Sequence, residues 1–140
     1  MMLKLTWMFA LLFTYLTFSI CGSGEKVISV QVTIESPQQG AEAGMAEIVK
    51  GKVSDPKAEV YVLVHPLLTN LWWVQRRPSP PGKDGAWQTT CYFGTESQGV
   101  GESFELVAIA SSKTYKEGQT LDELPKDAPR SDIITVKRVR

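Results

Sequence analysis

The sequence predicts an all-β fold, an antiparallel sandwich of seven strands preceded by an N-terminal hydrophobic helix. From residue 27 onward, apolar and polar residues alternate with a period of two, which is typical of half-buried strands and not of helices. Clusters of Pro, Gly, Asp and Ser interrupt this pattern at short intervals, and such spacing favours a sandwich or a barrel. One polar face per strand favours antiparallel pairing, because parallel sheets need helices to cover both faces.

The first 24 residues, MMLKLTWMFALLFTYLTFSICGSG, predict an export signal. Lys4 is followed by sixteen uncharged, mostly apolar residues at 5–20 and then by small residues at 21–24. A positive start, an apolar centre and a small-residue exit are the parts of a secretory signal peptide. The apolar run is at the short end of what a membrane helix needs, so an uncleaved anchor is the alternative. Both place the domain expected at 25–140 outside the cytoplasm, as a secreted, periplasmic or membrane-anchored protein.

Cys21 is a candidate lipidation site. The segment FSICGS at 18–23 resembles the lipobox of bacterial lipoproteins, in which a cysteine ends the apolar run and becomes the lipidated first residue. That pattern prefers Leu at the position of Phe18 and a small residue at the position of Ile20. Ordinary signal cleavage at 22–24 therefore remains the alternative to lipidation.

Seven strands are expected in the domain. They lie at 27–35, 45–53, 58–65, 71–75, 86–93, 103–110 and 133–139. The run 58–65 is apolar on both faces, which predicts a central strand. Asp84–Gly85 is a strong hairpin-turn dipeptide and predicts a tight turn before the fifth strand. In the long polar stretch 111–132, one turn of helix is expected at 121–124.

The alternation also predicts which side chains face the core. In the second strand, Val49, Gly51 and Val53 share one face, while Lys50 and Lys52 face solvent. Two later strands show the same pattern, because residues two apart on a strand point to the same side. Their inward residues are expected to be Trp87, Thr89, Cys91 and Phe93, then Phe104, Leu106, Ala108 and Ala110.

Two stretches carry a resemblance to a known family. The run VKGKVSDP at 49–56, followed by VYVLV at 60–64, resembles the second and third strands of bacterial immunoglobulin-like domains. The segments 73–75, 84–87 and 104–110 are similar to their later strands. The Cys–Trp–Cys core of antibody domains is missing, and Phe104 stands near where a corner Tyr is expected. Over residues 26–140, the resemblance implies an Ig-like sandwich that serves as a non-catalytic spacer, adhesion unit or ligand-binding domain of a surface protein.

Charge and composition exclude some partners. Fifteen basic and fifteen acidic residues give a formal charge of zero, and removing residues 1–24 takes away only Lys4, leaving fourteen against fifteen, or −1. A protein that binds phosphates usually has a basic surplus, so nucleic acid is not an expected partner. The composition, 43% hydrophobic and 21% charged, is that of a folded domain rather than a disordered chain.

No constellation for catalysis is visible, and we expect neither enzyme activity nor a cofactor or metal. Cys91 is the only cysteine after the leader and His65 the only histidine, which is too few for a thiolate zinc site. Cys91 alternates with apolar residues and is expected to be a small buried hydrophobe. His65, just before a proline at a strand end, is expected to be a surface or cap residue.

The candidate binding residues are Trp72, Trp73, Arg76 and Arg77. Adjacent strand residues point to opposite faces, so at most one of the two tryptophans can pack into the core. The other either lies on the surface, or lies under the 78–81 loop or against Tyr61. An exposed Trp can stack on a sugar ring or anchor a protein partner, and the arginines can pair with carboxylates.

The function predicted is therefore that of a non-catalytic exported Ig-like module. It acts in protein–protein contact or as a structural accessory domain at the cell surface or in the periplasm. The alternative is a carbohydrate-binding module that uses the exposed Trp. The partner is accordingly a protein or a glycan, with the membrane added if the leader is retained or lipidated.

Overall fold

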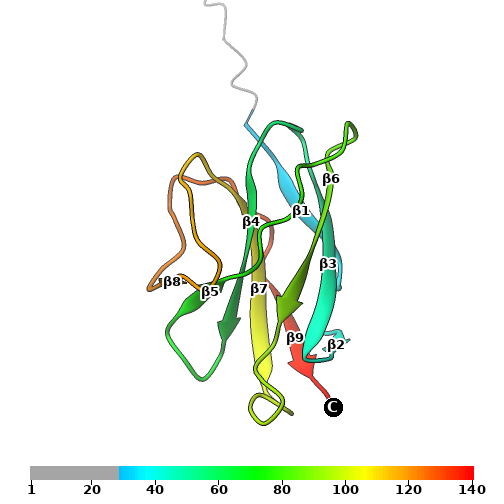
Figure 1. The fold of residues 1–140 in the computed structure, drawn as a ribbon, viewed down its shortest axis with the longest axis vertical. Coiled ribbons are helices and arrows are strands. Elements are labelled where there is room, and N and C mark those ends of the chain that lie inside the picture. Colours follow the sequence, from blue (N-terminus) through cyan, green and yellow to red (C-terminus); the bar gives the residue numbers. More distant parts are fainter. Residues whose placement is uncertain (1–28) are drawn as a thin grey trace, which may run out of the picture.

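The structure, a computed structural model, describes residues 29–140 (Figure 1). The leader, its expected helix and Cys21 lie outside these residues. Every regular element in the described part is a strand, which confirms the all-β prediction. The strands are β1 (Val32–Ser36), β2 (Glu42–Ala43), β3 (Ala46–Val53), β4 (Val60–Pro66), β5 (Trp72–Val74), β6 (Ala86–Tyr92), β7 (Ser103–Ala110), β8 (Thr120–Leu121) and β9 (Ile134–Arg138). Across residues 29–140 there is no helical segment with the length and apolar character to span a bilayer.

The strands form two sheets that pack face to face. One sheet has the order β1-β3-β6, and the other has the order β2-β9-β7-β4-β5-β8. The seven expected strands correspond to all but β2 and β8, which have two residues each. Pairing is antiparallel except between β2 and β9. That parallel pair departs from the prediction because the chain crosses from the first sheet to the second after β1 and joins the edge beside a strand running the same way.

The main core lies between the sheets and follows the predicted alternation. Val49, Gly51 and Val53 are buried, while Lys50 and Lys52 are exposed. The predicted inward residues of β6 and β7 are all buried as well. Gly51 is required here, because a Cβ at this position would overlap the carbonyl oxygen of Thr33 and the ring of Trp87.

A second apolar cluster covers the outer face of the six-stranded sheet. Its buried members are Tyr61, Leu63, Trp72, Val74, Val107 and Ile109. The segment between β7 and β9 folds back over this face, as the orange stretch beside β5 and β8 in Figure 1 shows. Tyr115, Leu121 and Leu124 of that segment pack against the cluster. Strand β4 is therefore buried on both faces and lies inside the sheet, as predicted for a central strand.

Three local predictions are corrected. The first strand begins at Val32, and residues 29–31, which were expected in it, are not part of a strand. No helix forms at 121–124, because Leu121 pairs with Trp72 in a short strand and both leucines pack on the sheet instead. Gly85 does sit in a turn, with a φ of 78° and its N–H donating to the carbonyl oxygen of Gly82 at 2.8 Å. That turn is not a hairpin, since β5 and β6 belong to different sheets and β6 pairs with β3.

Candidate functional site

The best-defined candidate site is a groove where β5 of one sheet meets β6 of the other, which we call the Trp73–Tyr92 groove. Its volume is about 390 Å³, within the range usual for small-ligand sites. The residues that border it and could contact a ligand include Thr69, Trp73, Gln75, Tyr92, Thr95 and Gln98. Val64 and Phe104, which belong to the main core, also line it.

The adjacent tryptophans have opposite fates, as the strand geometry predicted. Trp72 is 8% exposed and belongs to the outer cluster with Tyr61. Trp73 is 41% exposed and pairs with Val64, a residue of the inner face. Its indole therefore projects toward the inter-sheet side at the margin of the sandwich. Only Trp73 of the two is placed to meet a ligand.

Tyr92 supplies a second exposed aromatic ring from the other sheet. It is the last residue of β6 and is 49% exposed, whereas its neighbours Cys91 and Phe93 are fully buried. Tyr92 occupies a solvent-facing position of this alternating strand, so its side chain does not pack in the core. The groove thus has two half-exposed rings, contributed by separate sheets.

The buried side chain of Gln75 connects the two strands that carry these rings. Its Nε2 donates to the carbonyl oxygen of Trp73 at 3.1 Å, and its Oε1 accepts from the backbone N–H of Tyr92 at 2.8 Å. Gln75 is only 9% exposed, and its own N–H donates to the carbonyl oxygen of Val62. A single amide therefore fixes the margin of one sheet against the margin of the other.

The 94–98 loop forms the polar wall of the groove. The N–H of Thr95 donates to the carbonyl oxygen of Gln98 at 2.9 Å, and the N–H of Gln98 donates back to the hydroxyl of Thr95 at 3.1 Å. The guanidinium of Arg138, 4% exposed, donates to the carbonyl oxygens of Phe93 and Thr95. The wall is thus tied to β9 rather than left free.

The groove carries no ionic charge of its own. Within the part of the chain that the structure describes, none of the side chains lining it is acidic or basic. Its polar groups are amides, hydroxyls, a phenol and an indole N–H. The amides and hydroxyls both donate and accept hydrogen bonds and the indole N–H donates, so these groups favour an uncharged, hydroxyl-bearing partner over an ion.

The predicted arginines lie elsewhere. Arg77 pairs with Glu59 at 2.7 Å and lies over the ring of Tyr61 with its guanidinium carbon 5.6 Å from the centroid. Arg76 and Arg77 together border a different hollow, beside Ile48 on the three-stranded sheet. The structure therefore does not bring the two arginines into the groove with Trp73.

Cys91 and His65, the two residues considered for catalysis, are both held by contacts with the rest of the fold. Cys91 is a free thiol that is fully buried, and this burial raises the pKa of the thiol well above its ordinary value. The ring of His65 is half-buried, with Nδ1 2.9 Å from a Glu105 carboxylate oxygen and Nε2 2.6 Å from the Thr69 carbonyl oxygen. It also packs on Trp72 at a centroid distance of 4.9 Å. Among residues 29–140, no three His, Cys, Asp or Glu side chains gather as a metal site would require.

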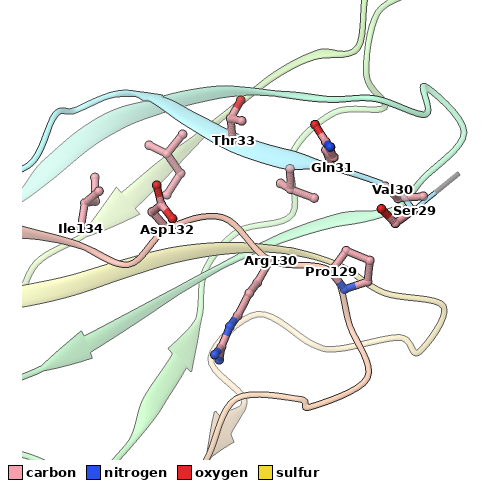
Figure 2. A pocket seen from close by; sticks show the side chains of 10 residues that line it. Ser29, Val30, Gln31, Thr33, Pro129, Arg130, Asp132 and Ile134 are labelled. Atoms are coloured by element: carbon pink, nitrogen blue, oxygen red, sulfur yellow. The ribbon is translucent and has the colours of Figure 1, made fainter.

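A second hollow runs along β1 and is shown in Figure 2. It lies between β1 and the 129–134 segment, and its volume is about 590 Å³. Figure 2 shows Asp132 pointing toward β1, whereas Arg130 points away from it. The hollow has no aromatic side chain among the residues that line it, so it offers less to hold a ligand than the Trp73–Tyr92 groove.

Sequence reasoning found Trp73 and missed the rest of the groove. The sequence contained a usable signal for Tyr92, because a large aromatic residue stands there at a position of the alternating strand that faces solvent. Gln75, Thr95 and Gln98 gave none, since polar residues at a strand end and in a turn are ordinary. Their role depends on which strands become neighbours.

Comparison with known proteins gives structural likenesses only. No family model matches the chain, and no curated protein matches it. The fold is similar to part of the endo-beta-1,4-mannanase from Thermotoga petrophila, with a TM-score of 0.50 and 15% identity. The likeness covers 84% of this chain but only 21% of that chain. At this identity the likeness concerns the fold alone.

Proposed function

We propose that this protein is a non-catalytic, exported Ig-like module that acts by binding, with the Trp73–Tyr92 groove as its contact site. The observation that carries the proposal is the pair of half-exposed rings, 41% and 49% exposed, that stand on different sheets. Exposed aromatics in a concave site are favoured anchors for a partner. The buried amide of Gln75 supports the same role, because it holds the two strands at a fixed spacing before any ligand arrives.

The strand order supports the Ig-like part of the proposal. In Ig domains, strands A, B and E share one sheet, and strands G, F, C and C′ share the other. The order β1-β3-β6 corresponds to the first set, and β9-β7-β4-β5 corresponds to the second. Strand β2, beside β9, and strand β8, beside β5, extend the larger sheet at its edges. This correspondence supports an Ig-like arrangement of the seven main strands.

The leader supports export. Residues 1–24 have the parts of a signal peptide or anchor. Mass spectrometry of the mature N-terminus tests export. A lipidated Cys21 or a free amine at residues 22–24 supports it, and a soluble cytoplasmic chain that still begins at Met1 contradicts it.

Cross-linking in cells that export the protein tests the contact site. A photoreactive phenylalanine analogue replaces Trp73 in one version of the full chain and Ile48 in a matched version. Ile48 is a good control because it is 54% exposed on the outer face of the three-stranded sheet. We expect adducts from position 73 that disappear when Tyr92→Ala is added, and none from position 48. Equal adducts at both positions would refute the contact site, and the absence of adducts at 73 would refute a protein partner there.

A second candidate function is carbohydrate binding. One specific observation favours it, namely that the side chains lining the groove are all uncharged in the described part of the chain. Aromatic rings beside neutral hydrogen-bonding groups suit a sugar better than they suit a charged peptide.

A further inference from the structure

We propose that the groove takes a neutral glycan, one without carboxylate or sulfate groups. This inference rests on the proposed binding function and names the class of its ligand. It follows from three properties of the groove: its two rings, its uncharged polar wall, and the backbone N–H of Tyr92 that is already bonded to Gln75.

The rings match one side of a sugar. A pyranose ring has a face of C–H bonds that is apolar, and it buries that face well against a flat aromatic surface. Trp73 and Tyr92 each present part of such a surface, since each side chain is about half exposed. The indole N–H of Trp73 and the hydroxyl of Tyr92 also give each ring a group at its edge that can donate a hydrogen bond.

The polar wall matches the hydroxyls at the rim of a sugar. The hydroxyl of Thr95 accepts from the N–H of Gln98 and has its own hydrogen left to donate. The side-chain amide of Gln98 is exposed and makes no hydrogen bond within residues 29–140. Sugar hydroxyls both donate and accept, so they can pair with all of these groups.

The positions of the arginines argue against an anionic ligand. Carboxylate and sulfate groups are held best by Arg or Lys in charge-assisted hydrogen bonds. Arg76 and Arg77 border another hollow. The guanidinium of Arg138 is buried and donates to backbone carbonyls. No basic side chain of residues 29–140 lines the groove.

The backbone beside the groove argues against a peptide strand. A peptide that adds to a sheet edge needs free N–H and C=O groups on that edge. At the groove, the N–H of Tyr92 is taken by the Gln75 side chain at 2.8 Å. Further along β6, the hydroxyl of Thr89 is bonded to the carbonyl oxygen of Arg76. The Tyr92 N–H beside the groove is therefore not free to pair with an added strand.

Affinity electrophoresis of the purified exported protein tests the inference. The gels contain either neutral polysaccharides (β-glucan, xyloglucan, galactomannan and hydroxyethylcellulose) or anionic ones (polygalacturonate and heparin). We expect at least one neutral polysaccharide to retard the protein. Trp73→Ala and Tyr92→Ala should each weaken that binding about tenfold, whereas Trp73→Phe, which keeps a flat ring, should weaken it less.

The controls distinguish binding at the groove from loss of folding and from nonspecific adsorption. Ile48→Ala, an exposed apolar change outside the groove, should leave the retardation unchanged. Gln75→Leu should weaken binding while both rings remain present, because the two strands lose their common amide. Thermal unfolding of every variant identifies any loss that comes from misfolding.

Each outcome bears on one of the two proposals. No retardation by any neutral polysaccharide, retardation by the anionic ones alone, or equal retardation of the Trp73→Ala and Ile48→Ala variants overturns the neutral-glycan inference. If glycans fail while position 73 still cross-links to a protein, the binding function stands and only the ligand class is wrong. If position 73 gives no adduct and no glycan binds, both proposals fail.

Discussion

The two sheets of this domain treat their outer faces differently. The outer face of the three-stranded sheet is exposed to solvent, with Lys50, Lys52 and Gln88 exposed and Ile48 54% exposed. The outer face of the six-stranded sheet is covered, and Tyr61, Leu63 and Ile109 on it are completely buried. The cover is the 111–132 segment, which contributes β8 and several half-buried apolar side chains.

The difference shows how a mostly polar segment can act as part of a core. Leu121, Leu124 and Ala128 are scattered among charged and turn residues, yet they meet one apolar face. A sheet face of this size cannot stay exposed without cost, because about 25 cal/mol is lost for each Å² of apolar surface left in water. The segment therefore removes apolar surface that a simple two-layer sandwich would expose.

The largest expected effect separates the two tryptophans. Trp72→Ala should lower the free energy of unfolding by about 3–5 kcal/mol, because it leaves a cavity under the covering segment. Trp73→Ala, its neighbour, should change it by less than about 1 kcal/mol, because the indole is 41% exposed. Urea unfolding of both variants measures the difference. Similar losses would mean that Trp73 is also a core residue.

Gly51→Ala tests the packing between the sheets. Its new methyl group would overlap the Thr33 carbonyl oxygen and the ring of Trp87, so we expect a loss of about 2–3 kcal/mol from overpacking. Lys50→Ala, at the exposed neighbouring position, should stay within about 0.5 kcal/mol of the parent protein. If both variants unfolded at the same urea concentration, β1 and Trp87 would have to lie farther from Gly51 of β3 than the structure shows.

Leu121→Ala tests the cover directly. Leu121 is half-buried against the outer cluster, so its truncation should cost about 1–2 kcal/mol. Ile48→Ala removes a comparable apolar side chain from the uncovered sheet and should cost no more than about 0.5 kcal/mol. Thermal unfolding compares the two. The contrast between the outer faces fails if Ile48→Ala costs as much as Leu121→Ala.

Cys91 gives an effect that is absent at neutral pH and grows only in alkaline solution, and it reports on the inner face of the three-stranded sheet. Burial raises the pKa of its thiol in the folded protein, so the native state keeps the proton while the unfolded chain loses it above about pH 8.5. Stability from this group is thus complete below that pH and falls as the pH rises, by at most about 1.4 kcal/mol per pH unit.

The measurement for Cys91 is urea unfolding between pH 7 and 10, compared with Cys91→Ala. The difference in slope between the two proteins isolates the thiol from the tyrosines and lysines. A thiol reagent should also react with the parent protein only after unfolding. Rapid reaction of the folded protein would show that the inter-sheet core opens at β6.

Much of the fold could be predicted because strand identity depends on local alternation. The seven main strands, the inward faces of β3, β6 and β7, and the central position of β4 all follow from side chains two residues apart. The same rule predicted that Trp72 and Trp73 point to opposite sides. It could not decide which one is buried, because that depends on the 111–132 segment, which lies far from them in the sequence.

The sequence by itself determined the strands, their inward sides and the opposite orientation of Trp72 and Trp73, since each of these needs only the period-two geometry of an extended chain. Only the tertiary structure decided the groove. Gln75 and Tyr92 are seventeen residues apart and belong to different sheets, and they meet because the chain crosses between the sheets after β5. The same crossing keeps Arg76 and Arg77 out of the groove. Non-local pairing, not local propensity, placed the aromatic rings and the neutral side chains around one hollow.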